Sequence, residues 1–221
     1  MSILAVTGLA KEARIAKQAG LVPVVGACDE TRLAAKLEAL PQDIVAVVSF
    51  GIAGSLSPLL HPGDVVVASH VVGENEHYVC DPDWARILRG RLFGSQSGIV
   101  AGVGEVVGHI SMKKALMQTL GAHAVDMESH IAARFAKKRG LPLAALRAIS
   151  DPHNRTLPPA ALVPLGPNGK ARLALVLKSL IGDPGQFFEL VQTGREAGKA
   201  FRALVRARRL LGPGLGCPYR G

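Results

Sequence analysis

The stretch IVAVVSFGIAGSLSPLLHPGDVVV, residues 44–67, holds two short apolar runs on either side of a glycine-rich segment. Val and Ile dominate both runs, Ile44–Ser49 and Val65–Ala68, without the polar alternation of a half-exposed strand. Such runs are typical of strands that are buried on both faces. The segment between them, Ser49–Leu56, has the glycines of a compact turn. Two buried strands in one stretch indicate a sheet that helices cover.

Apolar runs of this kind alternate along the chain with segments of helical periodicity. Further strands are expected at Ile3–Val6, Leu21–Val25, Ile99–Val103 and Leu143–Ile149. Helices are expected at Lys11–Ala19, Thr31–Leu40, Met112–Leu120, Met127–Arg139, Lys170–Leu180 and Pro184–Leu211. The alternation predicts an α/β protein, a three-layer αβα fold around a central, twisted, mostly parallel mixed sheet.

The chain has 221 residues, of which 48% are hydrophobic, and this is enough for one domain with a sizeable core. We expect a single domain over residues 1–211 and a flexible tail over residues 212–221. The proline-rich segment 150–169 is interpreted as a loop within that domain.

The formal net charge is +9, and many of the cations lie near the C-terminus. Five basic residues share one helical face there, opposite an apolar face: Arg195, Lys199, Arg202, Arg206 and Arg209. The pattern favours a helix that packs on the domain with a solvated basic face. Contact with an anionic membrane is the alternative. Nucleic acid is not expected as a partner, because no recognition motif or interleaved aromatic residue accompanies the charge.

The three cysteines, at positions 28, 80 and 217, lack the spacing of a metal site or a disulfide framework. We therefore expect a cytoplasmic protein without a metal. The N-terminal residues carry no basic leader, and no apolar run is long enough to cross a bilayer, so neither a signal peptide nor a membrane span is expected.

Polar residues follow several of the predicted strands, where ligands collect in open α/β sheets. Glu12 follows the first strand, Asp151 follows the last, and Met127 and Glu128 precede a helix. Each has a purely structural alternative: a first-turn acid for Glu12 and Glu128, and an Asp-Pro turn for Asp151. Asp126 is interpreted as a helix cap.

Four motifs in order resemble the purine nucleoside and uridine phosphorylase superfamily, in particular its methylthioadenosine/S-adenosylhomocysteine nucleosidase branch. They are TGLAKE at residues 7–12, FGIAGSLSPLLHPGDVVV at 50–67, VDMES at 125–129 and LRAISD at 146–151. Within the superfamily, the length, the Gly51–Gly54 segment and the basic C-terminal helix are similar to the hopanoid-associated phosphorylases.

The resemblance implies cleavage of the N-glycosidic bond between ribose and a purine. Asp151 would protonate the leaving base at N7. Glu128 would bind the ribose 2′ and 3′ hydroxyls and stabilise the oxocarbenium-like sugar, with Met127 packed against it. The resemblance also implies substrate contacts at Gly51, Ile52, Val106, Val107 and Ser150, with Val106 in place of an aromatic ring that other members present to the base.

The nucleophile stays open between water and phosphate. The resemblance implies that Glu12 activates water, and Ser49 stands where the hexameric phosphorylases carry an arginine. Lys11, Arg14 or Arg32 could still reach an anion, so phosphate remains possible as a co-substrate. Hydrolysis is favoured, and no other cofactor is expected. The residues after Asp151, His153 to Arg155, are expected either to close over the site or to lie in solvent.

The closer resemblance implies adenosylhopane, an adenosine joined through its 5′ carbon to a triterpene, as the substrate. A nucleosidase for methylthioadenosine or S-adenosylhomocysteine is the alternative, and a non-catalytic nucleotide- or membrane-binding module is the alternative from another class. A homodimer is expected, because members of the family bind nucleosides at a dimer contact. Under the membrane alternative, the basic helix would rest on the inner face of the cell membrane.

Overall fold

The computed structural model describes residues 1–163, 166, 169–170 and 172–219. The strands are β1 (Ser2–Thr7), β2 (Val22–Val25), β3 (Ile44–Ser55), β4 (Val65–Val72), β5 (His77–Val79), β6 (Gln96–Gly102), β7 (Ala124–Asp126) and β8 (Leu143–Asp151). The α-helices are α1 (Ala10–Lys17), α2 (Glu30–Glu38), α3 (Pro82–Arg91), α4 (Ile110–Leu120), α5 (Ser129–Lys138), α6 (Leu173–Gly182) and α7 (Phe187–Leu211). Short 3-10 helices are η1 (Pro159–Ala161), η2 (Pro184–Gln186) and η3 (Pro213–Gly216).

The strands form one mixed sheet in the order β2-β1-β3-β7-β6-β4-β5, with β8 paired to both β3 and β4. The pairs β1–β2, β1–β3, β3–β8, β4–β6 and β6–β7 are parallel, and β3–β7, β4–β5 and β4–β8 are antiparallel. The predicted mostly parallel mixed sheet is confirmed. Because β8 pairs with β4 and β7 with β3, the pairings close a ring through β3, β8, β4, β6 and β7.

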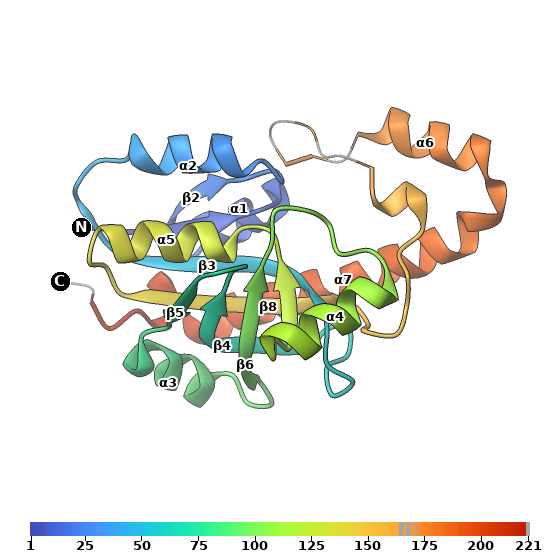
Figure 1. The fold of residues 1–221 in the computed structure, drawn as a ribbon. Coiled ribbons are helices and arrows are strands. Elements are labelled where there is room, and N and C mark those ends of the chain that lie inside the picture. Colours follow the sequence, from blue (N-terminus) through green and yellow to red (C-terminus); the bar gives the residue numbers. More distant parts are fainter. Residues whose placement is uncertain (164–165, 167–168, 171, 220–221) are drawn as a thin grey trace.

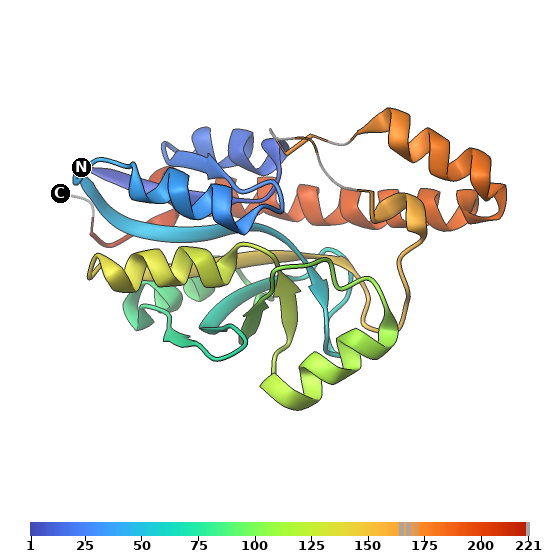
Figure 2. The same ribbon diagram turned by 45° about the horizontal axis from the view of Figure 1, so that its top comes forward.

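Helices cover both faces of the sheet, which confirms the three layers (Figures 1 and 2). Helices α1, α3 and α7 pack on one face through residues such as Ile15, Trp84 and Leu204. Helices α2 and α5 pack on the other face through residues such as Leu33 and Phe135. A smaller apolar cluster lies beneath α4.

The prediction of a turn at the glycine-rich segment is wrong, because this segment continues strand β3 as far as Ser55. Its glycines serve close approach rather than reversal of the chain: a Cβ at Gly51 would lie 2.6 Å from Oε1 of Glu12 and from Nη1 of Arg147. Two short strands, β5 and β7, and helix α3 were not predicted, and α5 begins at Ser129 rather than at Met127.

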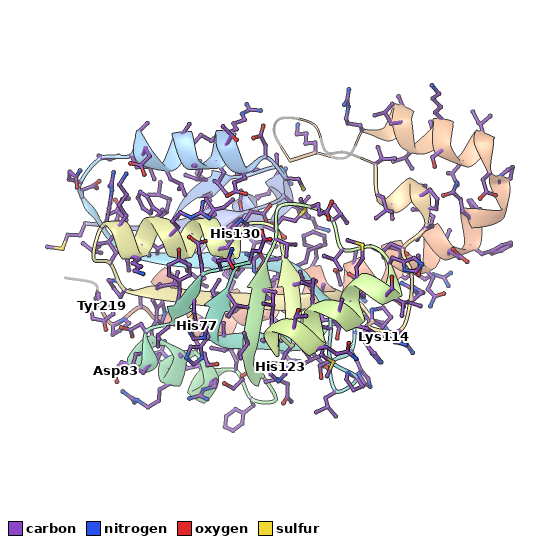
Figure 3. All side chains as sticks on the ribbon, viewed as in Figure 1. His77, Asp83, Lys114, His123, His130 and Tyr219 are labelled. Atoms are coloured by element: carbon purple, nitrogen blue, oxygen red, sulfur yellow. The ribbon has the colours of Figure 1, made fainter. Side chains whose placement is uncertain are left out.

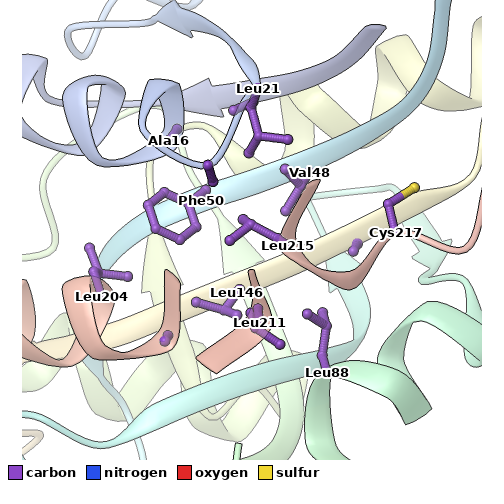
Figure 4. Close-up of a cluster of buried hydrophobic side chains, with 14 of the residues drawn as sticks. Ala16, Leu21, Val48, Phe50, Leu88, Leu146, Leu204, Leu211, Leu215 and Cys217 are labelled. Carbon is purple, nitrogen blue, oxygen red and sulfur yellow. The ribbon is translucent and has the colours of Figure 1, made fainter. Parts of the chain in front are cut away.

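The prediction of a flexible tail is wrong for the part of the tail that the structure describes. Leu215 is fully buried beside Leu204 and Leu211, and Cys217 is also buried (Figure 4). The indole Nε1 of Trp84 donates a hydrogen bond of 3.0 Å to the Leu215 carbonyl. The tail is held on α3 and α7 because Leu215 is buried there and because its carbonyl accepts the hydrogen bond of the buried Trp84 indole.

Helix α6 and the first half of α7 form a hairpin that projects beyond the sheet (Figures 1 and 2). At its tip Ile181 is 80% exposed and Phe188 is 81% exposed. The five basic residues of α7, Arg195 to Arg209, are exposed as predicted, while Ala200 and Leu204 face the core. In the described part of the chain no helix is both long and apolar enough to cross a bilayer.

Candidate active site

A cavity of about 200 Å³ opens where the carboxyl ends of β1, β3 and β8 meet the start of α5. These strands are neighbours in parallel register, so the residues that follow them share one edge of the sheet. The cavity is lined by Gly8, Leu9, Glu12, Cys28, Ile52, Ala53, Gly54, Val103, Glu105, Val106, Val107, Val125, Asp126, Met127, Glu128, Ser150, Asp151 and Leu157. The structure thus brings together every predicted site residue except Gly51, which lies buried behind Glu12.

Glu12 is held at the floor of the cavity by backbone amides. Oε2 accepts hydrogen bonds from the amides of Gly8 at 2.9 Å and Leu9 at 2.8 Å, and Oε1 accepts one from Ile52 at 2.8 Å. Burial raises the pKa of the carboxyl, while Arg147 and the three amides act in the opposite direction. A fixed carboxyl whose pKa is raised can accept a proton from a bound water molecule.

Glu128 lies at the N-cap of α5, and its carboxyl points towards β1 and the loop after β2. A Cβ at Gly8 would lie 2.8 Å from its Oε1, so only glycine leaves room for it there. Burial, together with the nearby charge of Asp126, raises the pKa of Glu128 to about 8, against the effect of Arg147. Met127 lines the cavity beside it.

A buried arginine, Arg147 of β8, supports both glutamates, and the sequence analysis missed it. Its Nε lies 2.9 Å from Oδ2 of Asp126, and both side chains are almost completely enclosed. Its Nη2 donates to Ser49 Oγ and, at 3.1 Å, to Ser129 Oγ. A charged residue within an otherwise apolar strand run was the available signal, because a buried cation needs a buried acid.

Asp126 does more than cap the helix. Its Oδ1 accepts hydrogen bonds from the amides of Glu128 at 2.8 Å and Ser129 at 2.7 Å, as a capping residue would. Its Oδ2 accepts from Ser129 Oγ at 2.5 Å and pairs with Arg147. Asp126 therefore ties the start of α5 to β8 and fixes the position of Glu128.

Asp151 ends β8 at the opposite wall of the cavity and is almost completely buried. Its Oδ1 lies 2.7 Å from Ser150 Oγ. Its Oδ2 accepts a hydrogen bond of 2.5 Å from Lys113 Nζ of α4, a second buried cation that the sequence analysis missed. The carboxyl therefore faces the cavity with both oxygens held in place.

The rest of the wall is apolar. Val103, Val107 and Leu157 line it together with Val106, which is 45% exposed at the mouth. None of the described residues that line the cavity is aromatic. Among His153, Asn154 and Arg155, none lines the cavity, and the guanidinium of Arg155 instead pairs with Glu196 of α7. Within the described ranges, no group of three His, Cys, Asp or Glu side chains could hold a metal ion.

Comparisons with known proteins agree with this fold. The model of the Phosphorylase superfamily matches residues 3–207. A search of curated proteins found no match.

Several solved structures are similar in fold. The 5′-methylthioadenosine/S-adenosylhomocysteine nucleosidase of Helicobacter pylori matches with a TM-score of 0.63 and 15% identity, over 92% of this chain and 96% of that one. A futalosine hydrolase mutant of Helicobacter pylori matches with a TM-score of 0.63 and 16% identity, over 83% of this chain and 100% of that one. The 5′-methylthioadenosine/S-adenosylhomocysteine nucleosidase of S. pneumoniae matches with a TM-score of 0.60 and 16% identity, over 94% of this chain and 99% of that one.

Proposed function

The chain belongs to the Phosphorylase superfamily, and on this premise we propose that it is an enzyme that cleaves the N-glycosidic bond of an adenosine-type nucleoside and releases adenine by hydrolysis. One observation carries the proposal: Glu12, Glu128 and Asp151, which are far apart in the sequence, line one cavity of about 200 Å³. A nucleosidase needs three carboxyl functions, one for the base, one for the sugar and one for the water.

Asp151 donates a proton to N7 of the purine while the bond between N9 and C1′ breaks, because the adenine anion is a poor leaving group. Glu128 accepts hydrogen bonds from the 2′ and 3′ hydroxyls and stabilises the positive charge that develops on the ribose. Glu12 takes a proton from the water that attacks C1′. The products are adenine and the free sugar, so atoms and protons balance.

The charges around the cavity favour water over phosphate as the nucleophile. No Lys or Arg occurs among the described residues that line it. Lys11 lies 4.0 Å from the centre of the Phe201 ring, and Arg14 and Arg32 are exposed. Arg147, the nearest cation to Glu12, is already engaged by Asp126 and two serines. A phosphate dianion would therefore enter a site without a free cation to receive it.

We propose adenosylhopane as the substrate, with the enzyme bound peripherally to an anionic membrane. Two exposed features support this. The tip of the α6–α7 hairpin presents Ile181, Phe187 and Phe188 to solvent, and α7 presents its basic face further along the same helix. Exposed apolar side chains together with a basic helix face are features by which peripheral proteins bind anionic bilayers.

A homodimer is also part of the proposal. Val106, at the mouth of the cavity, is 45% exposed, so the cavity wall that it forms is available for contact with a second copy of the chain.

Adenine release tests the proposal directly. The protein is incubated with adenosylhopane, methylthioadenosine or S-adenosylhomocysteine, each with and without inorganic phosphate, and free adenine and the sugar product are measured. We expect release from adenosylhopane that does not depend on phosphate. Release from only the two smaller nucleosides would show that adenosylhopane is not the substrate. A ribose 1-phosphate product would show that phosphate, not water, is the nucleophile. No adenine from any of the three nucleosides would reject the proposed function.

A further inference from the structure

Lys113 is a buried cation that the mechanism above leaves without a role. It lies on α4, its side chain is fully enclosed, and its Nζ is 2.5 Å from Oδ2 of Asp151. Nζ also donates to the carbonyls of Pro152 at 2.7 Å and Arg155 at 3.3 Å. Three acceptors surround an ammonium group that has three hydrogens, so the charged form is fully satisfied.

The surroundings of α4 make this lysine exceptional. Met112, Leu116 and Leu120 of the same helix pack on the apolar cluster beneath it. The next residue, Lys114, is exposed on the helix surface (Figure 3). An apolar side chain at position 113 would fill the space without the cost of desolvating an ammonium group. Stability alone therefore does not account for a lysine at this position.

The location of Lys113 relative to the cavity indicates what it does. Asp151 lines the cavity, whereas Lys113 does not and lies behind the carboxyl. A proton that leaves Asp151 for the substrate can thus be replaced from the side that no substrate occupies. The two groups are hydrogen-bonded directly, so the transfer needs no intervening water.

We propose that Lys113 is a positioning residue that supplies the proton which Asp151 delivers to the base. The inference rests on the proposed function. As the bond between C1′ and N9 breaks, its electron pair passes to the purine, and N7 takes a proton from the Asp151 carboxyl. Asp151 takes a proton from the Lys113 ammonium, which becomes an amine; after the base leaves, Asp151 returns that proton to Lys113 and is itself reprotonated by water that enters the cavity.

The test uses a substrate that does not need this proton. A nucleoside methylated at N7 carries a positive charge on its base and departs without protonation. The substrates are adenosylhopane and its N7-methyl derivative, and the variants are Lys113→Met, Lys113→Arg and, as the matched exposed control, Lys114→Met. Thermal unfolding verifies that each variant is folded, and Lys113→Gln replaces Lys113→Met if the latter does not fold.

For adenosylhopane we expect Lys113→Met to lower kcat by about 100-fold or more while KM changes by less than about fivefold. For the N7-methyl derivative the same variant keeps kcat within about threefold of the wild type. Lys113→Arg keeps the positive charge beside Asp151 but cannot give up its proton, so it should lose about as much on adenosylhopane as Lys113→Met does, and Lys114→Met has no effect.

Two results would overturn the inference. An equal loss on both substrates means that Lys113 only supports the fold of the site, and an unchanged kcat on adenosylhopane means that Asp151 needs no such partner. Failure of the wild type to release adenine from adenosylhopane, by contrast, rejects the proposed substrate or function itself and is seen before any variant is made.

Discussion

Arg147 Nε and Asp126 Oδ2 lie 2.9 Å apart in a part of the protein that solvent does not reach. Asp126 holds the first amides of α5, and the charge of Arg147 acts on both glutamates of the site. One ion pair therefore connects the helix that carries Glu128 to the strand that carries Asp151. The stability of the fold and the geometry of the site depend on the same contact.

Removal of one partner of this pair is expected to destabilise the protein strongly. Arg147→Met leaves Asp126 as an unpaired buried charge, so we expect a loss of about 3–5 kcal/mol in the free energy of unfolding, measured by urea denaturation. The double variant Arg147→Met with Asp126→Asn removes both charges and should recover part of that loss. A single variant within about 1 kcal/mol of the wild type would contradict the importance of the pair.

Glu128 gives the reaction a defined pH dependence. Its pKa in the free enzyme is raised to about 8, and the deprotonated form is the one that accepts hydrogen bonds from the ribose. We expect kcat/KM to rise with pH up to about 8 and then to level. Glu12 also has a raised pKa, so Glu128→Gln identifies the group: the limb near pH 8 should disappear in this variant.

The same residue links stability to pH. The folded state keeps a proton on Glu128 that the unfolded chain releases above its ordinary pKa of 4.5. The stability that this proton contributes is complete below that value and is lost as the pH rises through about 8. In urea denaturation, Glu128→Gln should match the wild type at pH 4 and exceed it by roughly 4–5 kcal/mol at pH 9. Equal stability at both pH values would argue against a raised pKa.

Glu12→Gln should separate catalysis from binding. Gln keeps one oxygen for the amides of Gly8 and Leu9 but places its NH2 group against the Ile52 N–H, so thermal unfolding verifies that the variant is folded. It cannot take a proton from water. We expect kcat to fall by about 100-fold or more, while the dissociation constant for the nucleoside, measured by calorimetry, stays within about threefold of the wild type. A variant that loses binding and turnover equally would assign Glu12 to substrate contact instead.

The hairpin tip can be tested independently of catalysis. Phe188→Ser combined with Ile181→Ser should weaken binding to phosphatidylglycerol vesicles at low salt by about tenfold or more, because two exposed apolar side chains are lost. Val79→Ser is the matched control, since Val79 is 67% exposed on the edge strand β5. If the wild type does not bind these vesicles, the membrane proposal is wrong.

Much of the fold and the main carboxyl groups could be predicted from the sequence. Apolar runs located six of the strands, and parallel strands necessarily bring Glu12 and Asp151 to one edge of the sheet. The segment at Gly51 was misinterpreted because glycine is common both in turns and where another side chain approaches an extended strand closely.

The two buried cations could not be placed from local pattern. Lys113 follows helical spacing that admits either a solvated or an inward side chain, and only the tertiary contact with Asp151 decides between them. Arg147 interrupts an apolar strand, which indicates a buried partner but does not identify Asp126. The order of the C-terminal tail could not be predicted for a similar reason. Leu215 stands among glycines, and nothing in that local sequence indicates that its carbonyl accepts a hydrogen bond from Trp84.

The central claim is that Asp151 is the acid that allows adenine to leave. The most direct test is adenine release by Asp151→Asn, a change that removes the proton donor and barely alters the shape of the side chain. With adenosylhopane at saturating concentration, we predict a rate at least about 100-fold below that of the wild type, with ligand binding retained in calorimetry. Adenine release near the wild-type rate would contradict the account.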